Sequence, residues 1–143
     1  MEGYARINLS KTNYQIDLDM RHLPNPDTKR LEEIYDAYVK YKKFPSVMPL
    51  FPEEYTYPQS DTWGYYDDDV LVAFSLIFSY NWKNAAALQF AWDYKKPKLR
   101  LGIRSLKCMC ATYKNQGFDY LYIGGSDEYK RTLDGFEILG PRN

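Results

Sequence analysis

The chain has 143 residues, which suits one compact domain, and we expect residues 1–143 to fold as a single unit. With 45% hydrophobic and 27% charged residues, the composition is typical of a globular protein and excludes a disordered tail. Lysine plus arginine balance aspartate plus glutamate at 19 each, so the chain has no overall positive field to collect nucleic acid.

Signals for membrane insertion, secretion and metal binding are missing from the sequence. The first twenty residues carry charges throughout, and no stretch reaches the roughly 20 apolar residues of a membrane span. Cys108 and Cys110 fall in a predicted helix, where side chains two apart point about 200° away from each other, so they are poorly placed to pair or to share a metal. The only histidine, His22, lies in a predicted loop. We therefore expect a soluble, cytoplasmic protein with reduced thiols, no metal and no membrane partner.

The first third of the chain predicts strands followed by one helix. Apolar residues alternate within 7–9 and again within 14–20, which is the period of a strand. The stretch 25–44 changes to the helical period, and either Asp27 or Thr28 is suited to be its N-cap.

The rest of the chain predicts a hairpin and then a strand–helix–strand unit. Strands at Thr62–Tyr66 and Val70–Tyr80 are joined by a turn of aspartates. The elements after the hairpin are a strand at 84–93, a helix from Gly102 or Ile103 to Asn115, a strand at 118–125 and an edge strand at 135–139. The two strands that flank this helix should lie side by side and parallel. Ligands of open α/β sheets bind at such a switch in strand order, so this is where we expect a site.

The order of these elements, with the segment "ALQFAWDYKKPKLRLGIRSLKCMCATYKNQGFDYLYIG", resembles the GNAT acyltransferase fold. That resemblance implies an α/β domain with a mixed, mostly antiparallel sheet and one parallel strand–helix–strand crossover at the cofactor loop. In this fold the loop amides hold the pyrophosphate of acetyl-CoA at a helix N-terminus, where free N–H groups and the helix dipole favour anions.

The acetyl-CoA loop of that family is matched only in part. Its signature has Gln or Arg, two residues, Gly, one residue, and then Gly or Ala. Gly102 and Ile103 fit this signature, but Leu99 and Arg104 stand where Gln or Arg and the second small residue belong. A bulky residue would crowd a pyrophosphate against the backbone, so we expect weak or absent acetyl-CoA binding.

A second branch of the fold resembles the chain more closely. Arginyl-tRNA–protein transferases and related aminoacyl-tRNA-dependent enzymes share motifs that are similar to several short stretches here. These stretches are Trp92-Asp93-Tyr94, Leu99-x-Leu101-Gly102-x-x-Ser105, Tyr120-Leu121-Tyr122-Ile123-Gly124, Tyr129-Lys130 and Phe136-Glu137-Ile138-Leu139. The resemblance implies that the acyl donor is a small molecule such as an acyl-CoA, or an aminoacyl-tRNA.

The resemblance also suggests roles for individual residues. Asp93 is the candidate general base or else a cap, and Tyr122 is the candidate acid or else a core tyrosine. The candidate cofactor-binding residues are Arg100, Gly102, Ile103, Arg104, Ser105 and Lys130. The candidate aromatic wall for the substrate consists of Tyr80, Trp82, Trp92 and Tyr94.

Two classes of function remain open from the sequence. The first is an acyl or aminoacyl transferase that modifies an amine on a protein or a nucleic acid. The second is a catalytically silent GNAT-like protein that binds a protein or nucleic-acid partner. A GNAT-like enzyme that modifies nucleic-acid bases is a further alternative, although the balanced charge favours it less.

Overall fold

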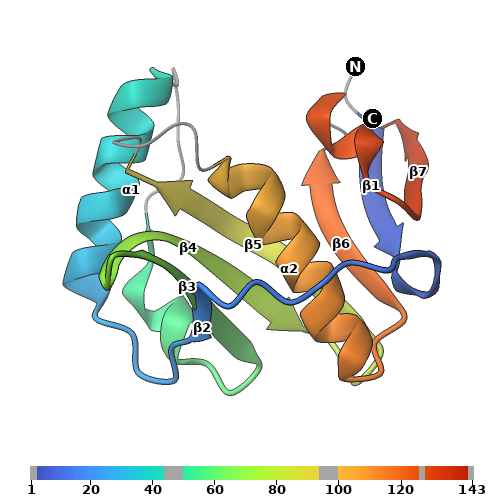
Figure 1. Ribbon diagram of the computed structural model, residues 1–143, viewed down its shortest axis with the longest axis horizontal. Coiled ribbons are helices and arrows are strands. Elements are labelled where there is room, and N and C mark those ends of the chain that lie inside the picture. Colours follow the sequence, from blue (N-terminus) through green and yellow to red (C-terminus); the bar gives the residue numbers. More distant parts are fainter. Residues whose placement is uncertain (1–2, 44–49, 94–99, 126–127, 142–143) are drawn as a thin grey trace.

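The structure is a computed structural model that describes residues 3–43, 50–93, 100–125 and 128–141 (Figure 1). Its strands are β1 (Gly3–Asn8), β2 (Met20–His22), β3 (Ser60–Asp67), β4 (Val70–Ser79), β5 (Asn84–Trp92), β6 (Tyr120–Gly125) and β7 (Phe136–Pro141). Its helices are α1 (Thr28–Lys42) and α2 (Leu101–Asn115), and short 3-10 turns occur at η1 (Leu9–Lys11), η2 (Pro52–Thr56) and η4 (Glu128–Thr132).

The seven strands form one sheet in the order β2-β3-β4-β5-β6-β1-β7. Among the described strands, β5 and β6 form the one parallel pair, and α2 lies between them in the sequence. The predicted fold class is therefore confirmed, including the parallel crossover and the position of β7 at an edge of the sheet.

The two helices pack on opposite faces of the sheet. Successive side chains of a strand point to opposite faces, and along β4 Phe74 and Leu76 pack with Leu31 and Ile34 of α1. The alternate β4 residue Ile77 belongs instead to the core beneath α2. Helix α1 begins at the predicted cap, since the Asp27 carboxylate accepts a hydrogen bond from the Lys29 amide.

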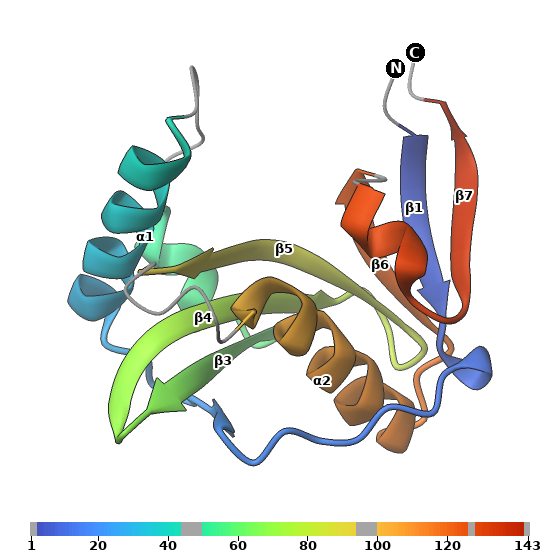
Figure 2. The same cartoon turned by 45° about the horizontal axis from the view of Figure 1, so that its top comes forward.

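Strands β5 and β6 separate after a short paired stretch. Asn84–Ala86 pair with Tyr120–Tyr122, and beyond these residues the two strands diverge (Figure 2). Each strand carries an unmatched residue just past the last pair: Leu88 on β5 opposite β4, and Ile123 on β6 opposite β1. Such bulges bend a strand and increase its twist, so they turn the two halves of the sheet apart.

The strand predicted between Tyr14 and Met20 is wrong. Only Met20–His22 form a strand, and residues 12–17 have no regular secondary structure. This segment crosses α2 (Figure 1), where the Asp17 amide donates to the Cys108 thiol. Its alternating apolar residues do not define a buried face, because the Leu18 side chain is 91% exposed.

Both cysteines are buried free thiols in the core beneath α2. Burial raises the pKa of the Cys110 thiol to about 12. Burial is also the main cause that raises the pKa of the Tyr55 and Tyr113 hydroxyls. At physiological pH these groups are therefore neutral members of the core.

We predict that the protein loses stability as pH rises above about 9. In the unfolded chain Cys110 loses its proton near its ordinary pKa of 9.0, whereas in the folded chain it keeps the proton until about pH 12. Its share of the free energy of unfolding should fall by about 1 kcal/mol per pH unit in this window. Urea unfolding at neutral and alkaline pH measures the decline. The Cys110→Ala variant should decline less steeply, and an equal decline would contradict the assignment.

Candidate functional site

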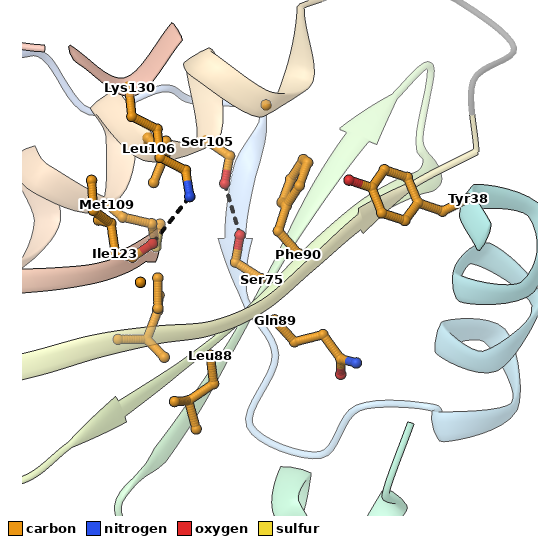
Figure 3. Close-up of a pocket in the computed structure, with 14 residues that line it drawn as sticks. Tyr38, Ser75, Leu88, Gln89, Phe90, Ser105, Leu106, Met109, Ile123 and Lys130 are labelled. Atoms are coloured by element: carbon orange, nitrogen blue, oxygen red, sulfur yellow. Dashed lines mark hydrogen bonds between the residues drawn. The ribbon is translucent and has the colours of Figure 1, made fainter. Parts of the chain in front are cut away.

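A cavity of about 300 Å³ occupies the opening between the diverging strands β5 and β6 (Figure 3). It is lined by residues 87–90 of β5, by Ser75 and Ile77 of β4, by the N-terminal half of α2, by the end of β6 and by Lys130 of η4. Tyr38 of α1 reaches it from the other side of the sheet. We refer to this cavity as the cleft.

The N-terminus of α2 opens onto the cleft. Arg100 takes the N-cap position in the left-handed region (φ 51°) and makes no side-chain capping hydrogen bond. The first-turn amides of any helix lack partners within the helix, and Gly102 of this turn lines the cleft. Among the described residues, a Cβ added at Gly102 would meet only the Phe90 ring, at 4.0 Å. The backbone is therefore approachable from the cleft side.

Two buried serines lie at the bottom of the cleft. The hydroxyls of Ser75 on β4 and Ser105 on α2 are 2.7 Å apart and hydrogen-bonded (Figure 3). Both residues are only 3% exposed. This bond ties the second turn of α2 to the centre of the sheet and thereby fixes the height of the helix N-terminus above β5.

Lys130 places an ammonium on the β6 side. Its Nζ donates to the Ile123 carbonyl at 3.0 Å (Figure 3). Ile123 is the residue of β6 that has no partner on β1. The next residue, Gly124, has φ +73°, a backbone conformation that only glycine adopts without strain. The cleft therefore combines helix amides on one wall with a cation on the other.

The two arginines near the predicted loop take different positions. Arg104 points away from the cleft and forms an ion pair with Asp17 at 2.8 Å, with its guanidinium over the Tyr65 ring. It does not line the cleft. Arg100 is exposed at the helix cap, and Leu99 lies outside the described residues.

The two candidate catalytic residues do not line the cleft. The Asp93 side chain is 9% exposed, and its carboxylate lies 3.9 Å from the guanidinium of Arg30 on α1. Tyr122 accepts a hydrogen bond from Arg6 at 3.2 Å and lies near the Tyr4 ring. Because Leu121 and Ile123 belong to the core beneath α2, Tyr122 faces the opposite side of the sheet.

The predicted aromatic wall is split between the two ends of β5. Trp92 is partly buried at the C-terminal end of β5 and packs against the core. Tyr80 and Trp82 lie in the hairpin before β5 and are 63% and 78% exposed. Tyr94 lies outside the described residues. Ile103 lies in the first turn of α2 and packs against the core.

Sequence reasoning missed three polar groups that line the cleft: Tyr38, Ser75 and Gln89. Gln89 lies on the α1 side of β5, opposite Phe90 (Figure 3), and its side-chain oxygen accepts a hydrogen bond from Tyr55. No local motif marks these residues, since they come from separate elements. The one available signal in the sequence was Ser75 itself, a polar residue within the apolar stretch of β4.

The cleft is lined by no aspartate, glutamate or histidine among the described residues. Across the parts of the chain that the structure describes, no three His, Cys, Asp or Glu side chains gather closely enough to hold a metal ion. Within the same parts, neither helix combines the length and apolar character needed to cross a bilayer.

Several solved structures share this fold. The C-terminal DUF2156 domain of a putative lysylphosphatidylglycerol synthetase from Agrobacterium fabrum is similar with a TM-score of 0.68 at 10% identity, over 87% of this chain and 46% of that one. N-myristoyltransferase of Saccharomyces cerevisiae, solved with bound myristoyl-CoA, has a TM-score of 0.63 at 14% identity, over 86% of this chain and 41% of that one. A putative GNAT-family acetyltransferase from Novosphingobium aromaticivorans has a TM-score of 0.62 at 15% identity, over 97% and 60%.

These TM-scores, at low sequence identity, show the fold: the chain has a GNAT-like architecture. It spans 41–60% of the length of the three structures just named. No protein-family model matches the chain, and no curated protein matches it by sequence.

We predict that Ser105→Ala destabilises the protein by about 1–3 kcal/mol, because it leaves the buried Ser75 hydroxyl without a partner. The double variant Ser75→Ala/Ser105→Ala should recover part of this loss, since neither polar group then remains buried. Urea unfolding of the two single variants and the double variant measures both effects. A double variant as unstable as the sum of the singles would contradict a coupled pair.

Proposed function

We propose that the chain is an acyl or aminoacyl transferase of the GNAT type, which binds its donor in the cleft and moves the acyl group onto an amine. One observation carries this proposal. The α2 N-terminus, whose cap residue Arg100 makes no side-chain capping hydrogen bond, opens onto the cleft. The cleft also contains the edge of β5 that no longer pairs with β6 among the described residues. A phosphate group and a linear acyl carrier therefore have adjoining places to bind.

The first-turn amides of α2 are the proposed binding groups for donor phosphates, because helix N-termini favour anions. The absence of a side chain at Gly102 lets a phosphate approach the backbone. The Ile103 amide belongs to the same turn, and Arg100 at its cap and Lys130 on the opposite wall supply positive charge. The proposed role of Ser105 is to hold this turn in place through its hydrogen bond to Ser75, and not to bind the donor.

The carrier of the acyl group is proposed to run along β5. From Ala87 to Phe90 this strand has no neighbour on its β6 side among the described residues. Its backbone groups can therefore pair with an amide-bearing chain, as an added strand would. The acyl carbon then lies near Leu88, where the cleft crosses the sheet.

Transfer forms a bond from the amine nitrogen to the acyl carbon and breaks the bond to the leaving thiolate or alkoxide. The proton lost by the amine finally resides on that leaving group, so the reaction balances without a further reactant. The cleft supplies no carboxylate or imidazole among its described lining residues. Catalysis is therefore proposed to rest on proximity and orientation, and base and acid roles for Asp93 and Tyr122 stay predictions.

Two donor classes are proposed. The departures at Leu99 and Arg104 from the acetyl-CoA signature argue against an acyl-CoA donor. Since Asp17 holds Arg104 away from the cleft, the departure at Arg104 no longer does so. The motifs that resemble aminoacyl-tRNA-dependent transferases support an aminoacyl-tRNA. A thermal-shift panel of acetyl-CoA, myristoyl-CoA, free CoA and aminoacyl-tRNA separates these classes, because a ligand of the folded state raises the melting temperature.

A catalytically silent binding module is the second candidate, favoured by the lack of a carboxylate or imidazole among the described cleft residues. This alternative predicts donor binding without transfer. Incubating the stabilising donor with a mixture of primary amines and following the product by mass spectrometry decides between the two candidates.

We predict that Gly102→Ala and Gly102→Val weaken donor binding in order of side-chain size, with at least a tenfold loss (about 1.4 kcal/mol) for valine. The fold should tolerate both, because an added Cβ meets only Phe90 at 4.0 Å and alanine favours a helix more than glycine does. Calorimetry with the donor measures affinity, and thermal unfolding without donor controls for folding. Unchanged affinity in a folded Gly102→Val variant would show that the donor does not bind at the first turn of α2.

The Asp93→Asn variant distinguishes a base from a structural ion pair. A general base predicts that transfer falls about a hundredfold while stability is retained. The pairing of Asp93 with Arg30 predicts instead a loss of about 1–2 kcal/mol in stability with transfer preserved. We expect the second result, because Asp93 does not line the cleft. Steady-state rates and urea unfolding of the same preparation give the two readouts.

A further inference from the structure

A second cavity, of about 240 Å³, lies on the side of the sheet that carries α1. It is lined by Glu54, Tyr57, Ser60, Phe78, Tyr80 and Leu88. Phe78 is two residues beyond Leu76 on β4, and Leu76 packs with α1, so both point to that face of the sheet. We call this cavity the aromatic cavity.

The aromatic cavity adjoins the cleft at one residue. Leu88, the unmatched residue of β5, lines both cavities, and its side chain is 48% exposed. Figure 3 shows Leu88 extending from β5 on the side away from Ser75 and Ser105. The two cavities therefore approach each other from opposite faces of the sheet and meet where β5 and β6 part.

Three rings give the aromatic cavity an affinity for apolar and cationic groups. Tyr57, Phe78 and Tyr80 line it, and the Phe78 and Tyr80 rings form an edge-to-face pair with centroids 5.1 Å apart. The Tyr57 and Tyr80 side chains are 46% and 63% exposed, which leaves their rings accessible. Aromatic faces bind other rings and attract cations.

Glu54 and Ser60 are two polar groups of the aromatic cavity that make no ion pair or side-chain hydrogen bond within the described parts of the chain. Glu54 is half-buried, and no cation among the described residues lies within ion-pair distance of its carboxylate. The Ser60 hydroxyl is buried and has no hydrogen-bond partner in the described parts of the chain. The accessible carboxylate of Glu54 therefore favours a ligand that donates hydrogen bonds and carries positive charge.

The size of the aromatic cavity limits the ligand. An apolar cavity of about 150 Å³ holds a benzene molecule, so about 240 Å³ holds one ring and a short aminoalkyl chain.

We propose that the aromatic cavity binds the acceptor of the transfer reaction, and that this acceptor is a primary amine joined by a short chain to an aromatic ring. The proposal rests on the proposed function. The ring packs among Tyr57, Phe78 and Tyr80, and the ammonium interacts with Glu54. The ammonium first releases one proton to solvent, and the neutral amine then reaches the acyl carbon past Leu88, at the junction with the cleft; its second proton goes to the leaving group.

Binding of phenethylamine to the full chain tests this proposal without any donor. Titration followed by NMR should show saturable binding with a Kd on the order of 1 mM. The carboxylate analogue 3-phenylpropionate, which keeps the ring and reverses the charge, should bind at least tenfold more weakly. Equal binding of the amine and the acid would overturn the proposal.

Two variants locate the binding site. Glu54→Gln keeps the shape of the side chain and should weaken phenethylamine binding about tenfold, which corresponds to about 1.4 kcal/mol. Glu53→Gln is the matched control, because Glu53 is exposed on the same turn and does not line the aromatic cavity. Tyr80→Ala, at an exposed position that should not affect folding, should also weaken binding. Equal affinities in Glu54→Gln and Glu53→Gln would overturn the proposal.

A transfer assay separates failure of this inference from failure of the proposed function. Transfer to amines at rates that Glu54→Gln leaves unchanged would overturn the acceptor site while the transferase stands. Glu54-dependent amine binding with no transfer from any donor would make the aromatic cavity an amine-binding site and overturn both its role as acceptor site and the transferase.

Discussion

The early end of pairing between β5 and β6 is the constraint on which the rest of the structure depends. A central strand that loses its neighbour leaves backbone donors and acceptors without partners, which is costly unless another group satisfies them. Here bulges at Leu88 and Ile123 bend the two strands apart. The Lys130 ammonium donates a hydrogen bond to the Ile123 carbonyl, while the backbone edge of β5 faces the cleft. The opening is thus built into the sheet.

The helix between these strands turns that opening into a site. Because α2 connects two parallel neighbours, it must run back across the sheet, and its N-terminus comes to lie beside the freed end of β5. The Ser75–Ser105 hydrogen bond holds this end of the helix down. Across the outer surface of α2, the segment that contains Asp17 binds Arg104. That ion pair keeps a bulky cation out of the space where a donor is proposed to bind.

The two cavities would let the donor and the acceptor bind from opposite faces of the sheet. The cleft lies mainly under α2, and the aromatic cavity lies on the opposite face beside η2. Donor and acceptor would thus enter from different faces and meet at Leu88, so neither has to leave before the other binds. Such an arrangement favours direct transfer within one complex, which agrees with a cleft that is lined by no nucleophilic cysteine among the described residues.

The sequence by itself determined the elements whose signals are local. The Asp27 cap, the Asp67–Asp69 turn and the helix that starts near Gly102 follow from neighbouring residues, and the order of elements then implied the GNAT-like fold. Gly102, Ser105 and Lys130, named from sequence, do line the cleft. The tertiary structure decided that residues 14–19 are not a strand, that Arg104 turns to Asp17, and that Ser75, Gln89 and Tyr38 join the site. Those outcomes depend on contacts between residues far apart in the chain, and local periodicity contains no information about such contacts.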